Sequence, residues 1–361
     1  MTRRRIAVAM SGGVDSAVAA ALLKEQGYDV FGVTMLLAPE SGEQAADSAK
    51  KVTAKLGIPH RIIDLRHLFQ EKIITPFCTE YGRGRTPNPC VACNYYVKFG
   101  ALIDKAEKLG ADSIATGHYA RVDSATAGCR LLKGIDGSKD QSYFLYRLQQ
   151  AQLCRLLLPL GEYKKSRVKQ IAAGLRLANI VKPESQNICF IPGGDYRSFI
   201  AQHVLSPPGD IIDSECNILG RHEGLAHYTV GQRQGLGLSS TQPLYVIRLD
   251  AAKNRLVVGG QEQLFTSRLW VNHLNWVAGK APQETGGITA KVRYKSPEVL
   301  VKLNIDGDSA EVIFTKPQRA AAPGQSVVFY RGDEVLGGGI IENFKAAEEK
   351  PDESQMHADI R

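Results

Sequence analysis

Residues 5–16 read RIAVAMSGGVDS, and this stretch decides the fold of the first half of the chain. The apolar run 6–10 has the length of a buried strand, and after two glycines Val14 and Ala17 follow at helical spacing. The order is therefore strand, glycine turn and helix. Glycines let backbone N–H groups approach a phosphate, and the helix N-terminus adds positive potential. The stretch indicates a phosphate-binding loop.

The alternation of strands and helices continues to residue 116. Strand-like runs cover 29–35, 60–64 and 111–116, and the segments between them carry apolar residues at helical spacing. Such alternation predicts an α/β fold with a parallel sheet covered on both faces. From residue 207 onward, short Val-, Ile- and Tyr-rich strands with glycine turns indicate small β-barrels or sandwiches. We predict an N-terminal α/β domain over 1–205, a central β-rich domain over 206–277, a C-terminal β-barrel over 278–345 and a disordered tail over 346–361.

Composition excludes several classes of protein. The 361 residues are 43% hydrophobic and 23% charged, which is typical of globular domains and excludes disordered, collagen-like and coiled-coil chains. No segment approaches the roughly 20 apolar residues needed to cross a bilayer. We therefore expect a cytoplasmic protein with no membrane partner. The 45 basic and 37 acidic side chains give a net charge of +8, which favours polyanionic partners such as nucleic acid.

Seven cysteines are an odd number in a chain without a secretion signal, so we expect no stable disulfide framework. Cys93 lies beside a helix that Asn94 could cap, and a helix N-terminus lowers the pKa of a thiol. Cys189 lies in a second loop between polar and apolar neighbours. Both are candidates for a reactive thiol. The others are interpreted as packing residues: Cys78, Cys129, Cys154 and Cys216, with Cys90 treated below.

The motif S-G-G-V-D-S is neither a Walker A loop nor a dinucleotide-binding G-x-G-x-x-G motif. A bare Gly-Gly pair would be read as an ordinary tight turn. The complete motif, at the end of the first strand, resembles the signature of pyrophosphatase-loop (PP-loop) ATP enzymes, whose adenine-nucleotide alpha-hydrolase-like (HUP) domain adenylates a substrate oxygen. The resemblance implies ATP and Mg²⁺ over the carboxyl edge of the sheet, where ligands of open α/β sheets bind. The implied nucleotide-binding residues are Ala9, Met10, Ser11, Gly12, Gly13, Val14, Asp15, Ser16, Met35 and Gly117.

A set of further motifs follows in a fixed order along the chain. Taken together, and from about residue 5 to 344, they resemble the bacterial tRNA-specific 2-thiouridylase family. Most of these motifs would mean little singly, but their combination is specific. The motifs are Thr86-Pro-Asn-Pro, Cys93-Asn, Gly117-His-Tyr, Lys139-Asp-Gln-Ser-Tyr-Phe, Glu184-Ser-Gln-Asn-Ile-Cys-Phe, Tyr228-Thr-Val-Gly-Gln-Arg and Pro323-Gly-Gln.

The resemblance implies a sulfurtransferase that converts the wobble uridine of tRNA to 2-thiouridine. ATP adenylates the C2 oxygen of the base, and sulfur then displaces AMP. In the family scheme Cys189 accepts a persulfide from a sulfur carrier or a cysteine desulfurase relay, Cys93 assists sulfur release, and Asp15 belongs to the catalytic loop. Direct attack by the persulfide and prior release of hydrosulfide both remain open, and inorganic sulfide is an alternative donor.

The family also implies an anticodon stem-loop as the macromolecular partner. The target base has to leave its stack, and nucleotides of a loop do so at lower cost than those of a duplex. Arginine suits a phosphate contact, and tyrosine can stack on an unpaired base. The residues that match tRNA-binding positions are Asn88, Pro89, Cys90, His118, Lys139, Asp140, Gln141, Arg293, Tyr294 and Gln325.

Cys90 departs from the better-known form of the family loop, which has Asp at this position. Cys90, Cys93 and Cys189 could hold three irons of a [4Fe-4S] cluster and leave the fourth iron open to hydrosulfide. Zinc would need a fourth ligand, for which Cys78 or His118 is available. The alternative is that Cys90 simply replaces a surface Asp. The persulfide and cluster interpretations both stand at this stage.

Two other functions compete with the thiouridylase hypothesis. The first is another PP-loop synthetase or ligase, which would explain residues 11–16 but not Cys93 and Cys189. The second is a non-catalytic RNA-binding or sulfur-relay protein that retains the nucleotide domain as a scaffold. Formation of AMP that depends on tRNA distinguishes the thiouridylase from both.

Overall fold

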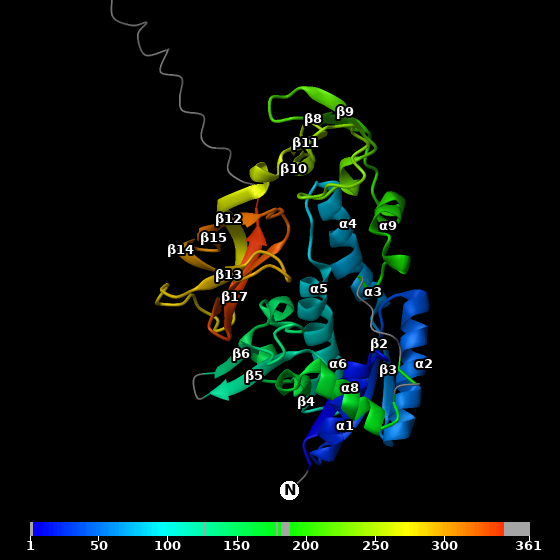
Figure 1. The fold of residues 1–361 in the computed structure, drawn as a ribbon. Helices are drawn as coiled ribbons and strands as arrows, with labels where there is room; N and C mark the ends of the chain where they lie inside the picture. Colours follow the sequence, from blue (N-terminus) through cyan, green and yellow to red (C-terminus); the bar gives the residue numbers. More distant parts are fainter. Residues whose placement is uncertain (1–2, 126–127, 178–179, 182–187, 343–361) are drawn as a thin grey trace, which may run out of the picture.

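The computed structural model describes residues 3–125, 128–177, 180–181 and 188–342. Figure 1 shows a helix-covered sheet at one end of the molecule, a small sheet at the other end, and a barrel beside them. The predicted tail 346–361 and residues 184–187 of the second cysteine motif lie outside the described residues. Within the described part, no helix has the length and apolar character needed to cross a bilayer.

A five-stranded parallel sheet forms the centre of the N-terminal part, in the order β3-β2-β1-β4-β7. The predicted first strand is β1, in which Ile6 and Val8 are fully buried and Ala7 lies opposite Phe31 of β2. The predicted α/β class with a parallel sheet is confirmed. The strands are β1 Arg5–Ala9, β2 Asp29–Leu36, β3 His60–Asp64, β4 Ser113–Ala115 and β7 Leu156–Leu157.

Helices cover both faces of this sheet, because side chains of successive strand residues point to opposite sides. Ile6 and Val8 pack in one apolar cluster with residues of α1, α2 and α8, whereas Ala7 packs in another with residues of α6. The main helices are α1 Val14–Glu25, α2 Pro39–Leu56, α4 Thr75–Gly82, α6 Leu102–Lys108, α8 Lys165–Gly174 and α9 Tyr196–His203. Short elements are α3 Arg66–Phe69, η1 Gln70–Ile74, η3 Ser142–Leu145, α7 Gln150–Leu153, η4 Pro159–Glu162, η5 Pro192–Gly194, η6 Leu225–His227 and η7 Gln261–Leu264.

The helix that carries Cys93 begins earlier than predicted. It starts as α5 (Pro89–Ala92) and continues as a π-helix, η2 (Cys93–Ala101), into α6. The N-cap is Asn88, whose side chain accepts a hydrogen bond from the N–H of Val91, and proline suits the first helical position. Asn94 is buried inside the helix, where its Nδ2 donates to the carbonyl of Phe144. The prediction that Asn94 caps the helix is wrong.

The central part is a four-stranded sheet in the order β10-β11-β8-β9. Its apolar side chains, among them Ile211, Val246 and Leu256, form a separate small core. The predicted boundary at residue 205 falls between α9 and the first strand of this sheet, and it stays a prediction. The strands are β8 Gly209–Ile212, β9 Ile218–His222, β10 Tyr245–Asp250 and β11 Arg255–Gly259.

The C-terminal part is a barrel in the order β12-β15-β14-β13-β16-β17, closed by pairing of β12 with β17. Because β12 spans Phe265–Trp276, the predicted boundary at 277/278 is about a strand too late. The hairpin of β5 and β6 extends this sheet from the N-terminal domain, with Leu132 opposite Glu334. The bounds are β5 Ala120–Ala125, β6 Gly128–Lys133, β12 Phe265–Trp276, β13 Thr289–Lys291, β14 Val299–Asp306, β15 Ser309–Arg319, β16 Ser326–Arg331 and β17 Glu334–Ile341.

Two of the cysteines interpreted as packing residues are bonded to each other. Cys129 in β6 and Cys154 after α7 form a disulfide with Cα atoms 5.7 Å apart. The expectation of no stable disulfide is therefore wrong for this pair. The fold brings β6 beside α7, where Gln150 also bonds the backbone N–H and C=O of Cys129. The spacing of cysteines along the sequence carries no signal of that contact.

Candidate active site

The glycine loop between β1 and α1 has the geometry expected of an anion-binding turn. Gly12 has a φ of +75°, and a Cβ there would lie 2.8 Å from the Cβ of Ser48 and 2.9 Å from the carbonyl oxygen of Ala45. Gly13 is the N-cap of α1 and makes no side-chain capping bond. The first backbone N–H groups of the helix therefore have no side-chain acceptor from the N-cap, and they are available to a phosphate.

Gly117 lies directly against this loop. A Cβ at Gly117 would lie 2.8 Å from the carbonyl carbon of Asp15 and 2.9 Å from the N atom of Ser16. The loop after β4 can approach the start of α1 so closely only because residue 117 has no side chain. The structure thus brings Gly117 together with the glycine loop, as the sequence predicts. Its contact with nucleotide remains a prediction.

The other predicted nucleotide-binding residues surround the carboxyl ends of β1 and β2. Ala9 ends β1 and Met35 lies near the end of β2, both half-buried against the same apolar cluster. Met10 is buried, and its carbonyl accepts a hydrogen bond from the hydroxyl of Thr34. The sheet edge therefore offers the apolar and small side chains that a nucleoside requires, beside the phosphate loop.

Asp15, in the first turn of α1, is held by two residues that sequence analysis missed. Lys165 Nζ lies 2.8 and 2.7 Å from Asp15 Oδ1 and Oδ2, and the Tyr119 hydroxyl donates to Oδ1 at 2.8 Å. Lys165 lies 150 positions from Asp15, at the start of α8. No local motif marks a partner so distant. Tyr119 belongs to the Gly117-His-Tyr motif, and this motif is the one feature of the sequence that could have indicated a partner of Asp15.

The three candidate cysteines lie in one neighbourhood. Cys93 is buried on η2, in an apolar cluster that also contains Phe190 and Ile188, the two residues that flank Cys189. Burial is the main cause that raises the pKa of Cys90 and Cys93, and the nearby Cys189 adds to it for both. Cys90 and Cys189 each retain an exposed face. The structure thus brings together Cys90, Cys93 and Cys189 from loops about a hundred residues apart.

The predicted low pKa of Cys93 is wrong. Burial raises the pKa of the Cys93 thiol to about 12, and burial also raises the pKa of Cys90 and of Cys189. The reason is the early start of the helix at Pro89, which places Cys93 beyond the first turn and inside the apolar cluster. In the free protein Cys93 is therefore a thiol at neutral pH.

Lys98 opposes this effect, and sequence analysis did not identify it. The ammonium of Lys98 lowers the pKa of Cys90, Cys93 and Cys189. Lys98 follows Cys93 by five residues on η2, the separation that the i→i+5 hydrogen bonds of a π-helix bring together, so both lie on nearly the same face. A π-helical segment cannot be recognised from the sequence pattern, so the sequence does not indicate that Lys98 lies near Cys93.

His118 connects the cysteine neighbourhood with the phosphate loop. It follows Gly117, its Nδ1 lies 2.8 Å from the hydroxyl oxygen of Thr116, and its ring packs 5.7 Å from that of Phe99 on η2. Burial, assisted by Lys98, lowers the pKa of His118 well below its ordinary value. The imidazole is therefore neutral, and a predicted tRNA contact by His118 would have to be a hydrogen bond instead of an ion pair.

The described residues offer no ready-made metal centre. Among residues 3–125, 128–177, 180–181 and 188–342, no group of three His, Cys, Asp or Glu side chains is placed to hold a metal ion. The described residues therefore show no ready-made zinc site, and a [4Fe-4S] cluster on Cys90, Cys93 and Cys189 stays a prediction. Mg²⁺ makes a smaller demand, because it usually binds one or two carboxylates together with substrate phosphates and water. Asp15, beside the phosphate loop, fits that requirement.

Several predicted tRNA-binding residues have partners inside the chain. Asn88 caps α5, Pro89 is its first residue, and Cys90 is exposed beside them. Asp140 is buried, and its carboxylate accepts bonds from the N–H of Gly134 and from the N–H and hydroxyl of Ser142. The structure thus gives Asp140 a role in shaping its loop.

The barrel residues face the N-terminal domain. The Tyr294 ring packs 4.5 Å from that of Phe144, and Arg293 Nη2 donates to the carbonyl of Arg319. Gln325 Nε2 donates to the carbonyl of Thr86 at 2.9 Å. The barrel therefore supports the loop that leads to Cys90. The predicted tRNA contacts of Lys139, Gln141, Arg293, Tyr294 and Gln325 stay predictions.

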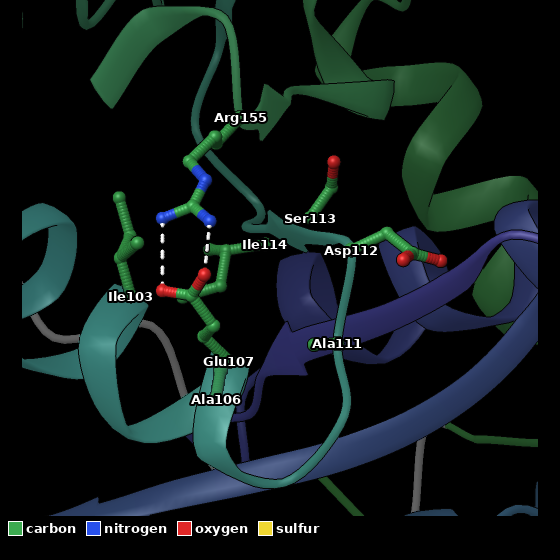
Figure 2. Close-up of a pocket in the computed structure, with 8 residues that line it drawn as sticks. All are labelled: Ile103, Ala106, Glu107, Ala111, Asp112, Ser113, Ile114 and Arg155. Carbon is green, nitrogen blue, oxygen red and sulfur yellow. Dashed lines mark hydrogen bonds and ion pairs between the residues drawn. The ribbon is translucent and has the colours of Figure 1, made fainter. Parts of the chain in front are cut away.

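A small pocket lies at the opposite edge of the sheet and has no part in this site. Figure 2 shows it at the amino end of β4, closed by an ion pair in which Arg155 contacts Glu107 at 2.6 and 3.1 Å. Its free volume of about 10 Å³ has room for about one water molecule. Gly117 follows the carboxyl end of the same strand, so the pocket is remote from the glycine loop.

The raised pKa of Cys93 can be checked directly. Only the thiolate reacts with iodoacetamide, so we expect the rate of Cys93 alkylation to rise about tenfold per pH unit and to keep rising above pH 9.0, the ordinary pKa of a thiol. Mass spectrometry of the Cys93 peptide after timed quenching gives the rate. A plateau below pH 9.0 would contradict the effect of burial.

Three models of protein families match three successive parts of the chain. Residues 4–193 match the "tRNA methyl transferase HUP domain", residues 197–260 the "tRNA methyl transferase PRC-barrel domain", and residues 266–341 the "Aminomethyltransferase beta-barrel domain". The last match begins within β12, in agreement with the strand pairing.

Relatives match nearly the whole length of the chain. A "tRNA-specific 2-thiouridylase MnmA" of Dehalococcoides mccartyi is 47% identical over 95% of this chain and 98% of its own length. A "tRNA-specific 2-thiouridylase MnmA 2" of Thermoanaerobacter sp. is 49% identical over 94% of this chain and 98% of its own. A "tRNA-specific 2-thiouridylase MnmA" of Syntrophomonas wolfei is 48% identical over 93% of this chain and 99% of its own length.

Proposed function

The chain belongs to the tRNA-specific 2-thiouridylase family, and from this membership we propose that it converts a uridine of tRNA to 2-thiouridine at the expense of ATP. It is a tRNA-uridine 2-sulfurtransferase. The observation that supports the proposal is the position of Cys93 in one apolar cluster with Ile188 and Phe190, the neighbours of Cys189, while Gly117 contacts the phosphate loop and His118 packs on the helix of Cys93. A synthetase or ligase would need the phosphate loop but not the two cysteines, and a non-catalytic binding protein would need neither the loop nor the cysteines.

The first step is adenylation of the base. C2 of uridine carries a urea-like carbonyl, which is a poor electrophile with a poor leaving group. The C2 oxygen attacks the α-phosphorus of ATP, the bond to the bridging oxygen breaks, and pyrophosphate leaves with the electron pair while N3 loses its proton. The N–H groups of the glycine loop and α1 bind the phosphates, and Asp15 is suited to hold Mg²⁺ on them. The metal supplies charge neutralisation when bound.

The second step replaces AMP by sulfur. The outer sulfur of a persulfide on Cys189 adds to C2, and AMP leaves. The Cys93 thiolate then attacks Cys189 Sγ, the sulfur–sulfur bond breaks, and its electrons form the C=S group of the product. A Cys93–Cys189 disulfide remains, which a cellular thiol has to reduce. Burial favours the Cys93 thiol in the free chain, and Lys98 assists loss of its proton.

Hydrosulfide released by Cys93 before attack on C2 is an equivalent route for the same residues. In that case Cys93 attacks Cys189 Sγ first, and the freed hydrosulfide adds to C2. A [4Fe-4S] cluster on Cys90, Cys93 and Cys189 is the competing hypothesis, and we derive no step through one. Iron and sulfide analysis after anaerobic purification, for the unmodified chain and Cys90→Ala, tests it: colourless, active protein without iron ends the cluster hypothesis.

We also propose the partners that this reaction requires. The anticodon stem-loop would contact the loop of Asn88, Pro89 and Cys90, with Lys139, Gln141 and the barrel residues Arg293, Tyr294 and Gln325 around it. A net charge of +8 supports binding of a polyanion. A persulfide carrier or cysteine desulfurase relay supplies sulfur through the exposed face of Cys189. The cytoplasm, where tRNA is modified, is the proposed location.

Mass spectrometry of nucleosides tests the proposal. The protein is incubated with tRNA, ATP and Mg²⁺, with a cysteine desulfurase and cysteine as the persulfide source and, in parallel, with inorganic sulfide, and the tRNA is digested to nucleosides. We expect 2-thiouridine or its derivative, together with AMP in amounts that depend on tRNA. AMP without a thiolated nucleoside would favour a different synthetase or ligase. Binding of tRNA with neither product would favour a non-catalytic relay or binding protein.

A further inference from the structure

Lys165 has surroundings that neither the motifs nor the proposed mechanism explain. Its side chain is only 10% exposed, although it carries a charge. Buried lysines are rare unless they are paired. Its Nζ contacts both carboxylate oxygens of Asp15, at 2.8 and 2.7 Å, and also lies 5.6 Å from the centre of the Tyr119 ring.

The backbone holds Lys165 firmly in this place. It is the first residue of α8, and its N–H donates to Asp136 Oδ2 at 2.9 Å. Val168 and Ala172 of the same helix are buried in the cluster that contains Val18 of α1. Figure 1 shows α8 beside α1, in agreement with the shared cluster. The ammonium is therefore aimed at the start of α1 by the packing of two helices.

The phosphate loop needs a cation at this point. The motif S-G-G-V-D-S contains an acid and no basic residue, unlike a Walker A loop, whose lysine reaches the phosphates. In the part of the chain that the structure describes, Lys165 is the only cation seen to bond a residue of 11–16. Without it, the Asp15 carboxylate would repel a triphosphate from the adjacent N–H groups.

We propose that Lys165 is a catalytic residue of the adenylation step, whose ammonium passes from Asp15 to the phosphate chain when ATP binds. There it stabilises the charge that pyrophosphate gains as the bond between the α-phosphorus and the bridging oxygen breaks. Asp15 is released at the same moment to hold the metal ion. This inference rests on the proposed function, because it assumes ATP in the glycine loop.

Binding of ATP without metal separates this role from a purely structural one. The variants are Lys165→Met, Asp15→Asn and the double variant, with Lys169→Met, an exposed lysine of the same helix, as the matched control. Isothermal titration calorimetry in EDTA measures ATP and, as a probe without phosphates, adenosine. We expect Lys165→Met to weaken ATP binding about ten- to a hundredfold and to leave adenosine binding unchanged. Lys169→Met should change neither.

The double variant decides between contact and neutralisation. If Lys165 contacts phosphate, the double variant binds ATP at least about tenfold more weakly than Asp15→Asn alone. If Lys165 only neutralises Asp15, the double variant and Asp15→Asn bind ATP equally. That result overturns the inference and leaves the proposed function intact. An unmodified chain that binds no ATP would overturn the proposed function and this inference with it. The double variant removes both charges of the pair, and in Asp15→Asn the amide oxygen can still accept a hydrogen bond from the Lys165 ammonium, so both should fold.

Discussion

Replacement of Cys93 by alanine abolishes thiolation of tRNA, with an expected loss of about a thousandfold or more in the rate of 2-thiouridine formation. Cys93 is the buried thiol that the fold places in one apolar cluster with Ile188 and Phe190, the two neighbours of Cys189. Binding of tRNA should be unchanged, because Cys93 is buried. Nucleoside mass spectrometry measures product, and filter binding measures affinity.

Cys78 provides a closely matched control. Its thiol is 7% exposed, as is that of Cys93, and it belongs to the same apolar cluster. Cys78→Ala therefore removes an equal volume from the same core and should keep activity. For Cys189→Ala, which should also abolish thiolation, the exposed Cys216 is the corresponding control. Retained product in either Cys93→Ala or Cys189→Ala would refute the assigned roles.

The sequence predicts the strand, glycine turn and helix of residues 5–16 correctly because every signal for them is local. The strand, the two glycines and the first turn of α1 occupy residues 5–16, and their geometry depends on neighbours along the chain. Gly117 was placed correctly for a similar reason, since it directly follows a strand of the same sheet. The predicted start of the helix that carries Cys93 is wrong because two asparagines compete as its N-cap. Asn88 with Pro89 forms a better start than Asn94.

The features of the fold and of the candidate site that the sequence does not predict depend on tertiary contacts. The partner of Asp15 comes from α8, 150 residues away, and nothing near Lys165 marks it. The strand β12 was assigned to the wrong domain because an alternating pattern shows that one face is buried, but not which sheet it joins. The pKa of Cys93 depends on burial among residues from four helical segments and the loop of Phe190, which no spacing predicts.

Replacement of Asp15 by asparagine should stop the reaction at an earlier stage than loss of either cysteine. The amide has the shape of the carboxylate and can still accept a hydrogen bond from Tyr119, so the loop should keep its structure. It lacks the negative charge that Mg²⁺ requires of a ligand. We expect AMP formation in the presence of tRNA, ATP and Mg²⁺ to fall about a hundredfold or more, while ATP without metal still binds.

The Asp15→Asn and Cys93→Ala variants should stop the reaction at different steps. Cys93→Ala stops sulfur release and should still allow adenylation, so one ATP is consumed and one pyrophosphate appears per bound tRNA, whereas Asp15→Asn prevents both. Chromatography of nucleotides after a single turnover distinguishes the two variants. Asp112→Asn is the matched control, because Asp112 lies at the amino end of the strands of the same sheet and its carboxylate, among the described contacts, accepts a hydrogen bond only from the N–H of Arg5. Unchanged AMP formation in Asp15→Asn would show that the glycine loop does not perform the adenylation.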